Sequence, residues 1–257
     1  MTRGYLHEGH AALVSLAQAQ GLRAVVCAFL SHRQFGPGED YALYPRDKRH
    51  DEEFAGKAGV DVLWVPSEEE VYPRGLSTEV HMPQIEHVLS GVVHADVLCA
   101  QVTATLRLIG LAQAETVYYG EQDWYKAATI RIALADLAIR TRVEVAPTSR
   151  APDGLALGTM NERLRPEERR SASFVFKALQ EAQNLFAQHG EVESTRLLGR
   201  TSAALTRIPG FRLQYVHLLN PTTLVEQHRA SPGDLLMVGG YFGRTRIADA
   251  VRLPDAQ

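Results

Sequence analysis

The chain begins with the decapeptide MTRGYLHEGH, in which His7 and His10 lie three residues apart with Gly9 between them. Residues at i and i+3 of one helical turn share a face, so the two imidazole rings would point the same way. Their ring N–H groups could then bind one anion together, such as a polyphosphate. The alternative interpretation is an ordinary pair of surface histidines near the start of the chain. These ten residues do not decide between the two.

The composition is that of a globular protein long enough to bury a core. Of 257 residues, 45% are hydrophobic and 22% are charged, which fits one large domain or two modest ones. A net charge of −3 offers no attraction for nucleic acid or an anionic membrane, so neither is an expected partner. Cys27 and Cys99 lie in apolar runs. We therefore expect buried, reduced thiols and a cytoplasmic location.

Apolar, β-branched runs alternate with helical patterns through the first part of the chain. The expected strands cover 23–31, 60–66, 116–120 and 142–147, and the expected helices cover 9–20, 46–58, 82–90, 97–112 and 123–137. This alternation predicts a doubly wound α/β sheet, with ligands bound at the carboxyl ends of its strands.

The pattern changes in the second part of the chain. Two helices are expected over 166–189 and 191–207, followed by three β-rich stretches. This order predicts a small α+β domain. We therefore divide the sequence into residues 1–154 and residues 155–257.

Six short motifs follow one another in an order typical of one family. They are GYLHEGH, QFGPGED (34–40), YPRD (44–47), YYGEQD (118–123), DGLAL (153–157) and GRTRIADA (243–250). On these motifs the chain resembles the pantothenate synthetases, from residue 2 to about residue 251. The resemblance implies a Rossmann-like, HIGH-type nucleotidyltransferase domain with a smaller C-terminal lid domain, and a homodimer.

The resemblance also implies a two-step ligase reaction. ATP, accompanied by Mg²⁺, adenylates the carboxylate of pantoate and releases pyrophosphate, and the amine of β-alanine then attacks the acyl adenylate. A carboxylate is a poor electrophile until one of its oxygens can leave as AMP. The protein must therefore orient two reactants and neutralise charge that develops on the phosphates.

Family roles transfer to matching positions of this sequence. His7 and His10 match the histidine pair at a helix N-terminus that contacts the ATP phosphates, and Gln34 matches a glutamine that binds pantoate and β-alanine. Asp123 matches a nucleotide-binding residue, although it could instead cap a helix. The further positions expected around ATP are Arg3, Gly4, Gly9, Gly120, Glu121, Gln122, Leu157, Gly158, Thr159 and Met160. We expect no metal ligands, because His81, His87 and His94 do not have metal-site spacing.

Several of these positions depart from the family pattern. Gln122 stands where the family has a phosphate-binding lysine, and Lys126 where it has a pantoate-binding glutamine. The other altered positions are Arg3, Ser31, His32, Val97, Leu98, Cys99, Ala100, Gly158, Thr159 and Met160, and of these Ser31, Val97 and Cys99 belong with Lys126 to the acid pocket that the resemblance implies. Loss of one oxyanion donor lowers a rate about 10²–10³-fold, so the losses would leave little activity without replacement. Lys126 lies one turn beyond Gln122 and could supply a relocated cation, together with Arg3.

Three functions remain open on the sequence alone. The first is the family's own reaction. The second is a sister ligase for another acid or amine, since Lys126 in place of a neutral glutamine could accept an acid with extra negative charge. The third is a catalytically inactive homologue that binds a nucleotide or a partner protein, or the product of a decaying gene. The family also has an apolar first strand that would end where Met1 stands, so either the true start lies upstream or this copy is damaged and lacks its central strand.

Overall fold

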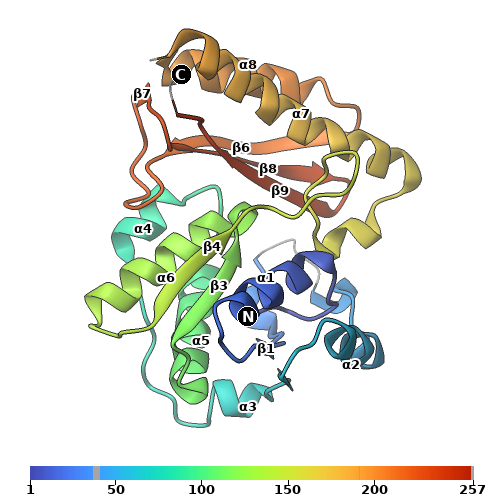
Figure 1. Cartoon of the computed structure of the whole chain (residues 1–257). Helices are drawn as coiled ribbons and strands as arrows, with labels where there is room; N and C mark the ends of the chain where they lie inside the picture. The colour runs from blue at the N-terminus through green and yellow to red at the C-terminus, as the bar shows by residue number, and fades with distance from the viewer. Residues whose placement is uncertain (37–40, 191, 256–257) are drawn as a thin grey trace. The chain divides into compact units, whose positions relative to one another are not determined.

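The computed structural model describes residues 1–36, 41–190 and 192–255. Residues 37–40 of the QFGPGED motif therefore lie outside the described residues. The described chain divides into two compact units. Figure 1 shows the chain coloured by residue number, from blue at the N-terminus to red at the C-terminus. Unit 1 comprises residues 1–120 and 129–147, and unit 2 comprises residues 121–128 and 148–257. The boundary expected at residue 154 falls inside unit 2, and the two domains of the sequence stay a prediction.

Unit 1 alternates helices with short parallel strands. Its elements are α1 (Glu8–Ala19), β1 (Val25–Cys27), η1 (His32–Gln34), η2 (Tyr41–Leu43), α2 (Lys48–Lys57), β2 (Val62–Trp64), α3 (Glu68–Val71), α4 (Pro83–Val88), α5 (Ala95–Ala112), β3 (Thr116–Gly120) and β4 (Arg142–Ala146). Helix α6 (Trp124–Asp136) begins in unit 2 and continues in unit 1. Strand β1 pairs in parallel with β2, and β3 with β4. The predicted α/β class of this part is therefore confirmed.

The parallel strands form two separate pairs, β1–β2 and β3–β4. Within the described residues no strand joins the two pairs. Thr2 makes a single parallel bridge to Ala28. Its N–H donates to the Cys27 carbonyl at 2.8 Å, and its carbonyl accepts from the Phe29 N–H at 2.9 Å. This bridge ties the residues before α1 to the carboxyl end of β1.

Helix α5 supplies much of the core of unit 1. Its buried residues include Val102, Ala104, Leu108 and Ile109. Among the described residues it is the one helix long and apolar enough to cross a membrane, with a mean hydropathy of 1.4. Half of its residues are buried inside the protein. Core helices of globular proteins show the same combination of length, hydropathy and burial.

Unit 2 is a three-stranded antiparallel sheet covered by two helices. Its elements are η3 (Glu121–Asp123), η4 (Thr159–Arg163), α7 (Pro166–His189), β5 (Val192–Glu193), α8 (Ser194–Thr206), β6 (Phe211–Leu219), β7 (Arg229–Ala230), β8 (Leu235–Phe242) and β9 (Thr245–Arg252). The sheet has the order β6–β8–β9. The predicted helices at 166–189 and 191–207 and the α+β class of this part are confirmed for the described residues.

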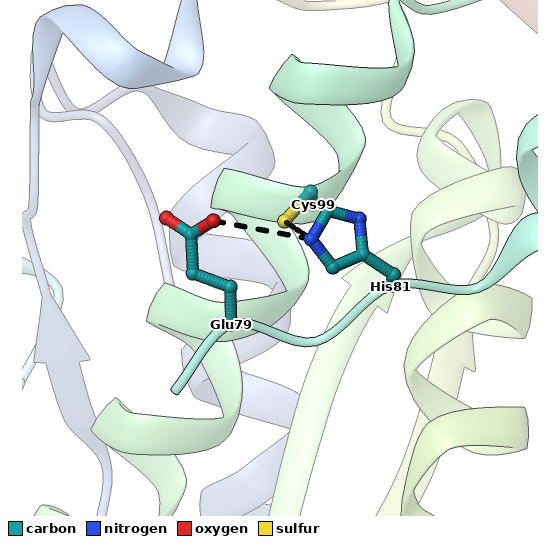
Figure 2. A group of neighbouring side chains, drawn as sticks. All are labelled: Glu79, His81 and Cys99. Carbon is teal, nitrogen blue, oxygen red and sulfur yellow. Dashed lines mark hydrogen bonds and ion pairs between the residues drawn. The ribbon is translucent and has the colours of Figure 1, made fainter. Parts of the chain in front are cut away.

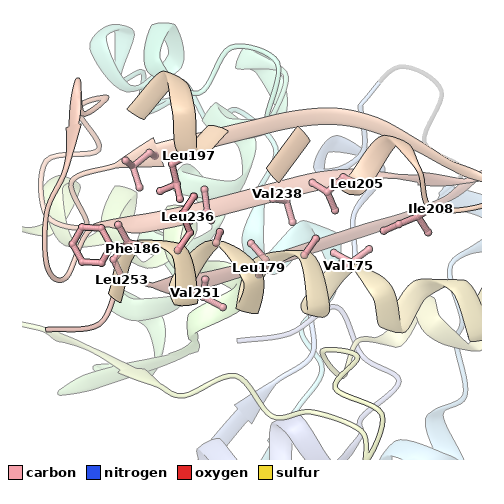
Figure 3. Packing of buried hydrophobic residues seen from close by; sticks show 14 of the residues in the cluster. Val175, Leu179, Phe186, Leu197, Leu205, Ile208, Leu236, Val238, Val251 and Leu253 are labelled. Carbon is pink, nitrogen blue, oxygen red and sulfur yellow. The ribbon is translucent and has the colours of Figure 1, made fainter. Parts of the chain in front are cut away.

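The core of unit 2 lies between α7, α8 and the sheet, as Figure 3 shows. Apolar side chains from all these elements interdigitate there: Val175, Leu179, Phe186, Leu197, Leu205, Leu236, Val238 and Val251. Strand β8 runs through the middle and approaches β6 closely at Gly240. A Cβ atom at that position would lie 2.5 Å from the Arg212 carbonyl oxygen. Only glycine allows this approach, because no real Cβ contact is so short.

Candidate functional site

The histidine pair lies at the N-terminus of α1, as the sequence predicted for a phosphate site. His7 is the N-cap residue and His10 the third helical residue, and their rings stand 4.1 Å apart between centroids. The imidazole of each accepts a backbone hydrogen bond on Nδ1, His7 from the Gly9 N–H at 3.2 Å and His10 from the His7 N–H at 3.1 Å. The two histidines thus complete a reciprocal capping box.

These hydrogen bonds fix the tautomer of both rings. Because Nδ1 accepts in each case, the proton of a neutral ring lies on Nε2, which can donate. The Nε2 atom of His10 also lies 2.9 Å from the Thr2 hydroxyl. Helix α1 adds the positive end of its dipole to the same place. Such an N-terminus with two imidazole donors binds an anion well.

A tight turn before α1 orients the histidines, and an acidic residue holds it. Gly4 and Tyr5 both have positive φ, 90° and 54°, which is uncommon for a tyrosine. The carboxylate of Asp51 accepts from the N–H groups of Tyr5 at 3.0 Å and Leu6 at 2.6 Å. Asp51 is only 8% exposed. A Cβ at Gly4 would lie 3.1 Å from the same carboxylate, so a glycine is needed there.

Sequence reasoning missed Asp51 and its neighbour His50. Both lie on α2, one turn beyond the YPRD motif, inside a charged run that resembles a solvated helix face. The His50 ring stacks on Tyr5 at 4.7 Å between centroids, and its Nε2 lies 2.8 Å from the Leu6 carbonyl oxygen. The position of the YPRD motif could have indicated them, because it places the next turn of α2 against the tight turn at Gly4 and Tyr5, here called the glycine turn.

Arg3 and Gln34 form a second group in unit 1. The Arg3 guanidinium lies over the Phe35 ring at 4.7 Å and donates to the Gln34 carbonyl at 3.1 Å. Gln34 is 9% exposed, and its side-chain carbonyl accepts from the N–H of Ser31 at 3.2 Å. The NH₂ of the same amide is then the polar end that can serve a carboxylate or hydroxyl. Arg3 therefore supports the loop of Gln34, and its role as a relocated cation stays a prediction.

The remaining predicted residues belong to unit 2, apart from Gly120, which ends β3. Gln122 donates through its amide nitrogen to the Leu157 carbonyl at 2.8 Å. Its side-chain oxygen is buried and has no hydrogen-bond partner among the described residues. Buried acceptors rarely lack a donor. Gln122 and Leu157 thus bring the GEQD and DGLAL motifs together and place a buried acceptor beside them.

Gly158 and Thr159 continue from the DGLAL loop into η4. Gly158 is the N-cap residue of η4, with its carbonyl accepting from the Asn161 N–H at 2.9 Å. Thr159 is 8% exposed, and Met160 is half-buried beside it. Neither side chain carries a positive charge, and the basic residue of η4 is Arg163.

Lys126 pairs with Asp123 within unit 2. Its ammonium lies 2.6 Å from the Asp123 carboxylate, and its side chain is 31% exposed. One residue of the expected nucleotide site thus neutralises the expected cation. Burial also raises the pKa of Glu121 above its usual value, although the charges of Arg252 and Arg150 oppose this shift. Of the residues expected around ATP, the structure therefore assembles two groups, one in each unit.

Comparison with known proteins identifies the family. A family model described as pantoate-beta-alanine ligase matches residues 1–252. The chain belongs to the pantoate–β-alanine ligase family. The pantothenate synthetase of Chloroflexus aggregans is 36% identical over 249 residues, which cover 96% of this chain and 90% of that protein. That of Thermus thermophilus is 37% identical over 252 residues, with 96% and 90% covered.

Solved structures of the ligase family share the fold. The crystal structure of the Thermus thermophilus pantothenate synthetase superposes with a TM-score of 0.91 at 35% identity, covering 98% of this chain and 91% of that one. The ligase from Francisella tularensis, complexed with β,γ-ATP and β-alanine, gives a TM-score of 0.78 at 26% identity, with 98% and 87% covered. The predicted fold, a HIGH-type nucleotidyltransferase domain with a C-terminal domain, is confirmed.

Proposed function

We propose that this chain is an ATP-dependent ligase that joins pantoate to β-alanine through an acyl adenylate. The observation that carries the proposal is the histidine pair at the start of α1, with each Nδ1 accepting a backbone N–H. Both Nε2 atoms are then donors, and that of His10, which lies 2.9 Å from the Thr2 hydroxyl, would exchange this partner for a phosphate oxygen of ATP. The Francisella relative was crystallised with β,γ-ATP and β-alanine, which supports the same two substrates here.

The proposed reaction transfers the pantoate acyl group in two steps. A pantoate carboxylate oxygen attacks the α-phosphorus of ATP, and pyrophosphate leaves with the electrons of the broken P–O bond. The β-alanine amine then attacks the acyl carbon, AMP leaves, and the nitrogen loses a proton. His7 and His10 stabilise charge on the departing pyrophosphate, while the Gln34 amide NH₂ holds the pantoate.

Mg²⁺ enters with ATP as part of the substrate. Mg²⁺ prefers six hard oxygen ligands and keeps several of its waters. The described residues contain one group of three possible metal ligands, which includes a cysteine and a histidine and is unsuited to Mg²⁺. The phosphates and water therefore hold the ion, and we propose no protein ligand for it.

The second group of residues would bind the rest of the nucleotide. We assign Gly120, Glu121 and Asp123 to the nucleoside. Gln122 offers a buried acceptor, which suits a hydroxyl or amino donor of the nucleotide rather than a phosphate. The DGLAL loop contributes Leu157, Gly158, Thr159 and Met160.

A sister ligase is the second candidate function, and Lys126 favours it. Its partly exposed ammonium lies against Asp123, and a substrate acid with an additional negative charge could compete for it. The family's neutral glutamine would not select such an acid. We further propose a homodimer, as the resemblance implies, and a cytoplasmic location, because Cys27 and Cys99 are both buried free thiols.

The test is pyrophosphate release from ATP and Mg²⁺, measured with pantoate and then a panel of other acids, each with and without β-alanine. Release with pantoate that rises on adding β-alanine supports the family reaction. Release only with another acid would replace it by the sister ligase. Folded protein that binds ATP and releases nothing would overturn both, and would leave the inactive homologue.

Two variants test whether the histidines contribute to the rate of pyrophosphate release. His7→Gln and His10→Gln remove one ring each and should lower the rate about 10²–10³-fold, as for loss of an oxyanion donor. The matched control is His87→Gln, at an exposed histidine of α4, which should leave the rate unchanged. Equal rates in all three variants would exclude the proposed role of the pair.

A further inference from the structure

Three possible metal ligands converge in unit 1, and neither histidine of the α1 pair is among them. Glu79 and His81 lie on the segment before α4, and Cys99 lies on α5, as Figure 2 shows. One ligand atom from each residue lies within 4.8 Å of the others. Sequence reasoning missed this group, because the histidine spacing argued against a metal site and the cysteine comes from another element.

The distances between these atoms approach those of a tetrahedral metal site. The Cys99 sulfur lies 3.7 Å from the His81 Nε2, and that nitrogen lies 3.9 Å from the nearer Glu79 carboxylate oxygen. Around Zn²⁺, ideal tetrahedral geometry gives about 3.5 Å between sulfur and nitrogen and about 3.3 Å between nitrogen and oxygen. These two distances exceed the ideal values by a few tenths of an ångström, and the sulfur and the Glu79 oxygen lie within 4.8 Å of each other.

The residues behind the ligands hold them as outer-shell groups do in metal sites. The other ring nitrogen of His81, Nδ1, lies 3.7 Å from the Glu86 carboxylate. A metal-bound histidine commonly pairs its second nitrogen with a carboxylate in this way. The Thr103 hydroxyl hydrogen-bonds the Cys99 sulfur and accepts from the Val80 N–H at 2.9 Å. Thr103 therefore fixes both the cysteine and the segment that carries the other two ligands.

The surrounding charges suit a divalent cation. A thiolate at Cys99 and the carboxylate of Glu79 together balance two positive charges. Arg33 binds one carboxylate oxygen of Glu79, and the other oxygen faces His81. The carboxylate of Glu86, on the far side of His81, offsets the positive charge of Arg33. Glu79 and His81 are exposed while Cys99 is buried. A metal could therefore enter from solvent and be held on its inner side by the sulfur.

We propose that Glu79, His81 and Cys99 form a Zn²⁺ site with a fourth position left for water. Thiolate and imidazole ligands select zinc over magnesium or calcium, which prefer oxygen. Three protein ligands are fewer than the four of a closed structural site. The bound metal would join the segment before α4 to α5. The assignment of this site does not rest on the proposed ligase reaction.

The experiment is a titration of the full-length, metal-free protein with Co²⁺, followed by displacement with Zn²⁺. Four-coordinate Co²⁺ with a thiolate ligand gives a sulfur-to-metal charge-transfer band and intense visible bands, and we expect both at one Co²⁺ per chain. Displacement by Zn²⁺ should remove them. Their absence, with no Zn²⁺ bound in calorimetry, would overturn the proposal.

Variants locate the site. Glu86→Gln changes a residue behind the ligands and should reduce Zn²⁺ affinity about 10–100-fold. His81→Gln and Cys99→Ala each remove a ligand and should reduce Zn²⁺ affinity by more than that. The charge-transfer band should vanish in Cys99→Ala alone. His87→Gln and Cys27→Ala are the matched controls, at the other α4 histidine and the other free cysteine. Zn²⁺ affinity unchanged in folded His81→Gln, or lost equally in the controls, would refute the assignment.

Discussion

Replacement of Asp51 by asparagine tests how the histidine pair is oriented. Asp51 accepts two backbone hydrogen bonds, from Tyr5 at 3.0 Å and Leu6 at 2.6 Å, and is 8% exposed. Asp51→Asn keeps the shape but exchanges one accepting oxygen for an NH₂ that faces a backbone N–H. One charge-assisted hydrogen bond is lost, which costs about 1.5–3 kcal/mol.

The expected results of Asp51→Asn follow from this loss. The Tm should fall by about 3–12 °C, since 1 kcal/mol shifts it by about 2–4 °C in a chain of this size. The glycine turn would relax from the positive φ of Tyr5 and move His7 and His10. A misplacement of about 1 Å can lower a rate about 10²-fold. We therefore expect weaker ATP binding and a pyrophosphate-release rate reduced to that extent.

The assay combines thermal unfolding with ATP titration calorimetry and pyrophosphate release. Glu52→Gln is the matched control, because Glu52 follows Asp51 on α2, is exposed and pairs only loosely with Lys48, at 3.5 Å. This control should behave as the unaltered protein. An Asp51→Asn variant with unchanged Tm and ATP affinity would refute the claim that this carboxylate holds the turn.

Further predictions concern burial, charge and backbone approach. Burial raises the pKa of Cys27 to about 11, so at about pH 8 only about one thiol in a thousand is ionised. Alkylation followed by mass spectrometry should find Cys27 unmodified until the protein unfolds, and rapid labelling of the folded protein would contradict this. Because the folded-state pKa of Glu121 is raised by burial, its contribution to stability is fully present below about pH 4.3, the usual pKa, and is lost as pH rises through the folded value. The difference in free energy of unfolding, Glu121→Gln minus unaltered protein, should therefore increase as pH rises. A difference that decreases with pH would contradict a raised pKa for Glu121. Gly240→Ala should destabilise unit 2 by about 1–3 kcal/mol in urea unfolding, because the added Cβ would overlap the Arg212 carbonyl. Gly199→Ala is the control, because nothing lies close to the added Cβ at that position. Equal losses of stability in the two variants would contradict the overlap. Lys126→Gln should shift acid preference in pyrophosphate release toward pantoate if Lys126 selects a more negative acid, and an unchanged preference would exclude that role.

Periodicity and short motifs predicted the architecture because local patterns determine it. Alternating apolar runs placed β3 at Thr116–Gly120 within the described chain, and the amphipathic pattern placed α7 at Pro166–His189. The same level of reasoning placed His7 and His10 on one helical face, and the structure puts their rings together. Both features depend on residues that are close in sequence.

Contacts between distant segments could not be predicted in this way. Asp51 lies 45 residues from Leu6, and nothing in a charged helix indicates which carboxylate turns inward. Cys99 meets His81 across 18 residues, which no local spacing reveals. Each of these depends on packing between separate elements.

The central claim is that pantoate is activated as an adenylate and then transferred to β-alanine. Its most direct test supplies pantoate labelled with heavy oxygen in the carboxylate, together with ATP, Mg²⁺ and β-alanine, and follows the label by mass spectrometry. We predict one labelled oxygen in AMP for each pantothenate formed. Label in inorganic phosphate, or pantothenate formed with unlabelled AMP, would contradict the account.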